Sequence, residues 1–196
     1  MNRNLIPLVS LLACLAAFSV SAQTAKAPNI VFILIDDMGY ADLSCYGSDY
    51  FETPNIDRLA SEGTRFTSAY AACTVCSPTR ASLMTGKYPA RLHITHAIPI
   101  EGHLRRKETR YKDADYVKNM PLEEFTIAEA FKEAGYTTGF IGKWHCNWDE
   151  EYLPQYQGFD INIGGDWMGN PGDYFFPYKG EWRMTPEHPY RKWQVV

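Results

Sequence analysis

The chain has 196 residues, of which 45% are hydrophobic and 21% are charged, and its formal net charge is −4 at pH 7. This length and composition are those of an ordinary globular domain with a hydrophobic core. The mild negative charge argues against a nucleic-acid partner, although a local cationic pocket for an anionic substrate is compatible with it.

The first 22 residues have the pattern of a secretory signal peptide. Arg3 supplies the positive start, an apolar run extends from residue 5 to 20, and small residues precede a cleavage point after Ala22. A proline and a serine interrupt the run, so a membrane anchor is the less favoured alternative. We expect residues 1–22 to be removed and residues 23–196 to form a periplasmic or secreted domain without a membrane association.

An apolar run rich in β-branched residues, 29–35, predicts a strand buried on both faces, as in a parallel sheet. Asp36 and Asp37 follow it directly. Adjacent carboxylates repel each other unless a divalent cation lies between them, and their hard oxygen ligands favour Ca²⁺ or Mg²⁺. The two carboxylates can reach one ion only if the chain turns at Asp37. The alternative is that both aspartates are solvated residues of a turn.

The next segment predicts a helix and then a strand. Thr53 is a suitable cap, Pro54 suits the first helical position, and Gly63 can end the helix. Residues 64–70 alternate enough in polarity to predict a strand.

Cys76 stands just before a helix that Pro78 can start and Gly86 can end. The thiol is therefore expected where free N–H groups and the helix dipole favour negative charge. Arg80 adds a fixed cation whose planar donors suit oxyanions. A nucleophile beside an anion-binding site is what group transfer from sulfate or phosphate esters requires.

The cysteines have other possible roles. After signal removal, four remain, and in an exported protein they could form two disulfides. Cys73 and Cys76 also have the Cys-x-x-Cys spacing of redox and zinc sites. No second such pair follows, and a redox role leaves Pro78 and Arg80 unexplained, so we favour the nucleophile.

The second half predicts an α/β arrangement. Thr126 and Glu129 have capping-box spacing, and residues 136–141 predict a further strand. Alternating strands and helices favour a layered α/β fold. Residues 101–120 interleave basic and acidic side chains, which is typical of a solvated loop; alternatively this loop borders a pocket and meets a sulfated sugar. After residue 155, glycine, proline and aromatic residues favour irregular loops.

Lys143 and His145 follow the strand predicted at 136–141. They are two residues apart, so on an extended segment both side chains point the same way. Open α/β sheets bind ligands at the carboxyl ends of their strands, which makes both residues candidates for anion binding. Taken alone, this pair would be better explained as a surface lysine and a packed strand-end histidine.

In order along the chain, these segments resemble the signatures of the sulfatase family: the aspartate pair at 36–37, Cys-x-Pro-x-Arg at 76–80, and the glycine-to-histidine stretch at 135–145. The resemblance implies an alkaline-phosphatase-like α/β fold, a layered mixed sheet with helices on both faces, here incomplete. It implies that Cys76 is oxidised to formylglycine, and that Asp36, Asp37 and the modified Cys76 bind Ca²⁺, with Mg²⁺ less favoured. Arg80, Lys143 and His145 would bind the sulfate.

The resemblance also implies two partners, a formylglycine-generating maturation enzyme and a sulfated small molecule or polysaccharide. The family's later Asp-Asn pair, lysine and histidine do not occur before Val196. We therefore expect an amino-terminal part of a catalytic domain with little activity by itself. Two alternatives stay open: a phosphonate or phosphate monoester hydrolase that shares the cysteine motif, and a non-catalytic exported fragment.

Overall fold

The structure, a computed structural model, describes residues 27–98 and 114–170. The chain divides into two compact units, with the boundary between Gly39 and Tyr40. The predicted signal peptide and most of the charged stretch 101–120 lie outside the described residues. Within the described ranges, no helix is both long enough and apolar enough to cross a bilayer.

The first unit is extended where a buried strand was predicted. Residues 29–35 join no sheet among the described residues, and their side chains are exposed, with Val31 83% accessible. The strand prediction is therefore wrong for this structure, because a strand is held by hydrogen bonds to a neighbouring strand and the described residues provide none. The chain does turn at Asp36 and Asp37, where Asp37 has a φ of 55°.

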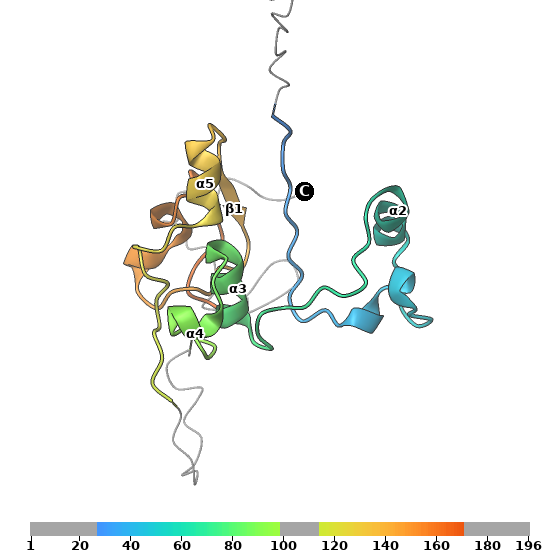
Figure 1. Ribbon diagram of the computed structural model, residues 1–196, viewed down its shortest axis with the longest axis horizontal. Helices are drawn as coiled ribbons and strands as arrows, with labels where there is room; N and C mark the ends of the chain where they lie inside the picture. Colours follow the sequence, from blue (N-terminus) through green and yellow to red (C-terminus); the bar gives the residue numbers. More distant parts are fainter. Residues whose placement is uncertain (1–26, 99–113, 171–196) are drawn as a thin grey trace, which may run out of the picture. The chain divides into compact units, whose positions relative to one another are not determined.

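The second unit contains short helices and a small parallel sheet (Figure 1). Its elements in chain order are η1 (Tyr40–Asp42), η2 (Ser44–Tyr46), α2 (Pro54–Glu62), α3 (Cys76–Thr85), α4 (Pro89–Leu92), α5 (Ile127–Glu133), β1 (Gly139–Ile141), η3 (Glu150–Tyr152), η4 (Pro154–Tyr156) and β2 (Ile161–Ile163).

Helix α2 begins at Pro54 and is followed by Gly63, as predicted. The hydroxyl of Thr53 does not cap it. Instead, Thr53 Oγ1 donates to Asp57 Oδ1 at 3.0 Å and accepts from the Ser44 N–H at 3.0 Å, which ties the helix start to η2. The strand predicted at 64–70 is wrong: these residues are exposed and irregular, with a bend at 67–68, and no strand pairs with them in the described part of the chain.

Helix α3 starts earlier than predicted. Cys76 is its first residue rather than the residue before it, and Pro78 lies in its first turn. The proline is tolerated there because the first-turn N–H groups have no helical partner. Gly86 ends the helix as predicted, with a φ of 67° and an N–H donating to Ser82 O at 2.8 Å.

The capping box of α5 is confirmed. The Glu129 N–H donates to Thr126 Oγ1 at 3.2 Å, and the Thr126 N–H donates to Glu129 Oε2 at 2.7 Å. Strand β1 lies within the predicted stretch 136–141 and pairs in parallel with β2, Gly139 opposite Ile161. Strand β2 falls where irregular loops were expected, because three residues with a polar centre carry too little pattern to mark a strand.

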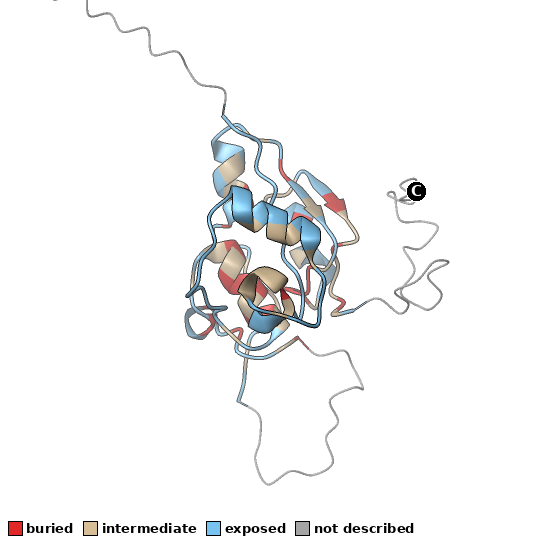
Figure 2. Ribbon diagram, turned by 90° about the vertical axis from the view of Figure 1, so that its right-hand side faces the viewer, coloured by how far each residue is buried: buried red, intermediate tan, exposed pale blue. Residues whose placement is uncertain are grey.

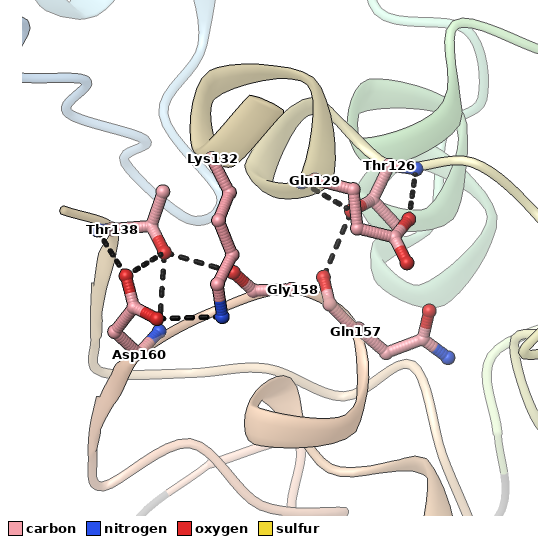
Figure 3. A network of polar contacts seen from close by, with 7 residues as sticks. All are labelled: Thr126, Glu129, Lys132, Thr138, Gln157, Gly158 and Asp160. Carbon is pink, nitrogen blue, oxygen red and sulfur yellow. Dashed lines mark hydrogen bonds and ion pairs between the residues drawn. The ribbon is translucent and has the colours of Figure 1, made fainter. Parts of the chain in front are cut away.

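Polar contacts fasten α5 to the segment that enters β2 (Figure 3). Thr126 Oγ1 donates to Gln157 O at 2.8 Å, and Thr138 Oγ1 donates to Gly158 O at 2.8 Å. The carboxylate of Asp160 accepts from the Thr138 N–H at 3.0 Å. Backbone groups just before each of the two strands are satisfied in this way, so the short sheet is held by side chains as well as by its own ladder.

Buried side chains gather around α3, α4 and the segment after β1; Figure 2 colours buried residues red. The core cluster consists of Ala81, Met84, Leu92, Ile94, Met120, Trp144 and Cys146, with Leu83, Phe140 and Phe159 packed against it. Trp144 is 1% exposed, and its indole N–H donates to Tyr152 O at 3.1 Å. Because this tryptophan stands between Lys143 and His145, its burial fixes the backbone that carries both.

Replacing Gly158 with alanine is expected to destabilise the chain. Gly158 has a φ of +92°, and a Cβ there would lie 2.5 Å from Glu129 Cγ and 2.7 Å from Glu129 N. Left-handed strain and the clash with helix backbone together predict a loss of about 2–4 kcal/mol in the free energy of unfolding. Urea denaturation measures it. Gly139→Ala is the matched control, because a Cβ at Gly139 meets nothing within 4 Å. Equal losses in the two variants would contradict this packing.

Candidate active site

Cys76 is half-buried at the start of α3, and its neighbours hold the first turn in place. Ser77 is fully buried, and its hydroxyl accepts from the Ile98 N–H at 3.0 Å. Thr79 Oγ1 donates to Cys73 O at 2.8 Å, which fixes the approach to the helix. The predicted nucleophile therefore occupies a defined position rather than a loose loop.

Arg80 lies one turn after Cys76 on the same helix, at the i, i+4 spacing that places two side chains on one face. It is 7% exposed, and Nη1 donates to the backbone carbonyl of Lys143. The guanidinium thus joins α3 to the segment that follows β1. The guanidinium of Arg80 therefore adds a positive charge with planar donors to the helix that begins at Cys76.

His145 is held from several sides. It is 5% exposed, its φ is 54°, and its N–H donates to Asp166 O at 3.0 Å. Ring atom Nε2 lies 3.0 Å from Ile98 O. A carbonyl can only accept, so Nε2 carries a proton. Gly169 packs against the ring, where a Cβ would come within 2.8 Å of Cε1. The ring has little freedom to rotate.

The thiol of Cys76 lies against this histidine. Burial acts to raise the pKa of Cys76, but hydrogen bonding with His145 and the positive charges of His145 and Lys143 outweigh it and lower the pKa from 9.0 to about 7. His145 Nδ1 is buried and has no partner of good hydrogen-bond geometry among the described residues. We therefore describe the pair as a close electrostatic contact rather than a fully formed hydrogen bond.

The pKa of Cys146 shifts in the opposite direction to that of Cys76. Burial raises its pKa from 9.0 to about 12, because the nearby Arg80 offsets only part of the desolvation. The four cysteines that the structure describes, Cys45, Cys73, Cys76 and Cys146, are all free, so no disulfide forms among them. Of these, Cys76 combines partial exposure with a lowered pKa, which is the environment of a reactive thiol.

Alkylation of unmodified Cys76 is expected to reach half its maximal rate near pH 7. Its folded-state pKa is depressed, so the stability that the thiolate contributes rises between pH 7 and 9 and is lost as the pH falls through 7. Iodoacetamide labelling followed by peptide mass spectrometry measures the rate. His145→Gln should move the midpoint to higher pH, because the largest lowering influence is removed. An unmoved midpoint would contradict the described contact.

The aspartate pair belongs to the first unit. Asp36 and Asp37 are exposed, and the left-handed turn at Asp37 is the turn that the sequence required for two consecutive carboxylates to serve one ion. Their oxygen donors fit a hard cation, although Ca²⁺ takes about six to eight oxygen ligands. Within the described residues, no group of three or more histidine, cysteine, aspartate or glutamate side chains is placed to hold a metal.

Four of the predicted site residues therefore come together in the second unit, namely Cys76, Arg80, Lys143 and His145. The residues that position them were not found from the sequence. Ile98 O and Asp166 O act through backbone carbonyls, which leave no signal in residue type. Gly169 is a weak signal, because glycine allows the histidine ring to approach the backbone closely.

These features define an α/β protein in which a helix beginning at a cysteine of lowered pKa lies beside cationic side chains that follow a parallel strand. The chain matches the family model Sulfatase over residues 28–191. It is 39% identical to N-acetylgalactosamine-6-sulfatase of Rattus norvegicus over 98% of this chain and 33% of that protein. It is 40% identical to arylsulfatase G of Rattus norvegicus over 79% of this chain and 27% of that protein.

Among solved structures, the PsFucS1 sulfatase from Pseudoalteromonas sp. matches with a TM-score of 0.55 and 34% identity, over 79% of this chain and 28% of that chain. The chain belongs to the sulfatase family, and the expected alkaline-phosphatase-like α/β fold is confirmed. It spans 33% and 27% of the lengths of the two curated relatives named here.

Proposed function

We propose that the protein hydrolyses a sulfate ester through formylglycine made from Cys76. One observation carries the proposal: Cys76 opens α3 with His145 and Lys143 close enough to lower its pKa, and Arg80 is one helical turn away. Two distant parts of the sequence thus contribute to one site, Cys76 and Arg80 from α3 and Lys143 and His145 from the segment after β1. Membership of the sulfatase family makes a sulfate ester the expected substrate.

In this proposal, Asp36, Asp37 and the modified Cys76 bind calcium, with magnesium less favoured. When bound, the cation would withdraw electron density from the sulfate oxygens and favour the ionised form of a hydroxyl next to it. The hydrated aldehyde offers two hydroxyls on one carbon, one to attack sulfur and one whose deprotonation later releases sulfate. This divides a difficult displacement into two steps.

The other residues act on charge and protons. Arg80 and Lys143 neutralise the sulfuryl oxygens as negative charge moves onto them, and Arg80 needs no reorganisation because its position is already fixed. His145 already carries a proton on Nε2 and lies against residue 76. We assign it a role at the departing hydroxyl, where an imidazolium can stabilise or protonate the leaving oxygen.

For the substrate we propose a sulfated carbohydrate or an aryl sulfate. The relatives named N-acetylgalactosamine-6-sulfatase and arylsulfatase G support this range of esters. A formylglycine-generating maturation enzyme is the required partner. The amino-terminal pattern supports a periplasmic or secreted location, where extracellular sulfated polysaccharides are accessible.

Parallel assays with 4-nitrophenyl sulfate and 4-nitrophenyl phosphate test the reaction class. Because the chain is expected to have little activity by itself, the full reading frame that contains it is expressed with the maturation enzyme, and nitrophenol release is followed at constant pH with and without a chelator. We expect turnover of the sulfate ester that the chelator abolishes and added calcium restores. Faster turnover of the phosphate ester would favour the phosphate monoester hydrolase instead. Absence of turnover of either ester, on a fully modified Cys76, would contradict the proposal.

A further inference from the structure

A pair of tryptophans lies beside the site at the carboxyl ends of both parallel strands. Trp148 follows His145 by three residues, and Trp167 directly follows Asp166, whose carbonyl accepts from the His145 N–H. The two rings meet at 5.8 Å between centroids, with planes at 62°. This strand edge is where α/β folds bind their ligands.

The loop that carries Trp148 is held firmly. Asn119 Oδ1 accepts from the Trp148 N–H at 2.6 Å and from the Asp149 N–H at 3.0 Å, while Asn119 Nδ2 donates to Asp149 Oδ2 at 2.7 Å. The buried Asn147 donates from Nδ2 to Asp149 O at 2.8 Å. A large aromatic side chain on a backbone fixed in this way loses little entropy when a ligand packs on it.

Both indoles are half-buried, and a cation stands next to them. Lys118 Nζ lies 5.7 Å from the Trp148 ring centroid, and the lysine side chain is exposed. At this distance the ammonium is attracted by the ring, yet it stays in contact with solvent and can reach an anionic group. An apolar ring face and a cation side by side match the apolar C–H face and the sulfate of a sulfated pyranose.

From this juxtaposition we infer that Trp148, Trp167 and Lys118 form a binding platform for a sugar ring of a sulfated saccharide, next to the ring that carries the hydrolysed ester. The inference rests on the proposed function, which requires an anionic ester beside Cys76. It adds a specificity determinant: the tryptophans take the ring, and Lys118 selects saccharides with a second sulfate.

Isothermal titration calorimetry tests the platform by measuring dissociation constants. The full chain carries Cys76→Ala in every sample, so that it cannot turn over the ligand. The probes are a sulfated chondroitin tetrasaccharide and its chemically desulfated counterpart. Trp148→Ala and Trp167→Ala should each weaken both ligands about tenfold. Lys118→Glu should weaken the sulfated ligand about fivefold or more, and should weaken the desulfated ligand, which keeps its uronate carboxylates, by a smaller factor. Tyr88→Ala, which removes an exposed aromatic ring elsewhere, is the matched control and should change neither.

Circular dichroism shows whether each variant is folded. Unchanged affinity in folded Trp148→Ala overturns the platform. If that variant does not fold, Lys118→Glu is the deciding variant, because an exposed lysine is not part of the core. If Lys118→Glu leaves the preference for sulfated over desulfated ligand unchanged, the platform is overturned. The proposed function can fail separately from the platform. If binding depends on the tryptophans but the protein releases no sulfate, only the proposed chemistry is contradicted. If the protein releases sulfate but binding does not depend on the tryptophans, only the platform is contradicted.

Discussion

Replacing Cys76 with alanine is expected to abolish sulfate-ester hydrolysis, lowering kcat roughly 10⁴- to 10⁶-fold, as removal of a covalent nucleophile does. The methyl group cannot become an aldehyde, so no attacking hydroxyl forms. Stability should change little, because Cys76 is only half-buried at a helix start. Initial rates with 4-nitrophenyl sulfate and a urea denaturation curve measure the two quantities on the same preparation.

Two controls sharpen this result. Cys73→Ala removes a neighbouring thiol that is also free and should leave the rate unchanged. Cys76→Ser should permit at most a single turnover, because a serine sulfate ester has no second hydroxyl to release sulfate. Steady turnover in the alanine variant comparable to that of the unaltered protein would contradict the nucleophile assignment.

Replacing Arg80 with alanine is expected to have the second largest effect, because this side chain serves both the fold and the site. Its guanidinium is buried and donates to Lys143 O, so the truncation removes that hydrogen bond and leaves a cavity beside α3. We expect the free energy of unfolding to fall by about 2–3 kcal/mol. Loss of the fixed cation should lower kcat about 10²- to 10³-fold.

Lys143→Ala separates these two effects. It removes the ammonium but keeps the backbone carbonyl that Arg80 contacts, so stability should fall less than in Arg80→Ala while activity falls. Arg80→Lys keeps the charge but loses the planar donor fork, and should recover little activity. If Lys143→Ala destabilised the chain as much as Arg80→Ala, the contact between Arg80 and this carbonyl would not be the link that holds the site.

The sequence predicted the helix ends better than the strands. Gly86 and the Thr126 capping box act within a few residues, and local chemistry of this kind survives in any context. The approach of His145 and Lys143 to Cys76 was expected because signatures of one family and the carboxyl edge of one strand both place them there. Recognising the family therefore supplied contacts between residues far apart in the chain.

The strands at 29–35 and 64–70 could not be settled in the same way. Their apolar composition predicts what a strand would bury, but a strand forms only where a neighbour offers hydrogen bonds and a face to cover. In the described residues, Val31 and Tyr70 are instead 83% and 89% exposed. Conversely, β2 forms because β1 pairs with it and because Thr138 binds Asp160, the residue just before it. The residues Ile161–Ile163 alone do not predict these contacts.

The chemistry of residue 76 is the claim on which the proposed function depends, and peptide mass spectrometry tests it most directly. The protein is produced with the maturation enzyme and digested with trypsin, which releases residues 66–80 with both Cys73 and the first residue of α3. The account predicts that Cys73 keeps its thiol while residue 76 carries an aldehyde that reacts with a hydrazide. An intact thiol at Cys76 in catalytically active protein would contradict it.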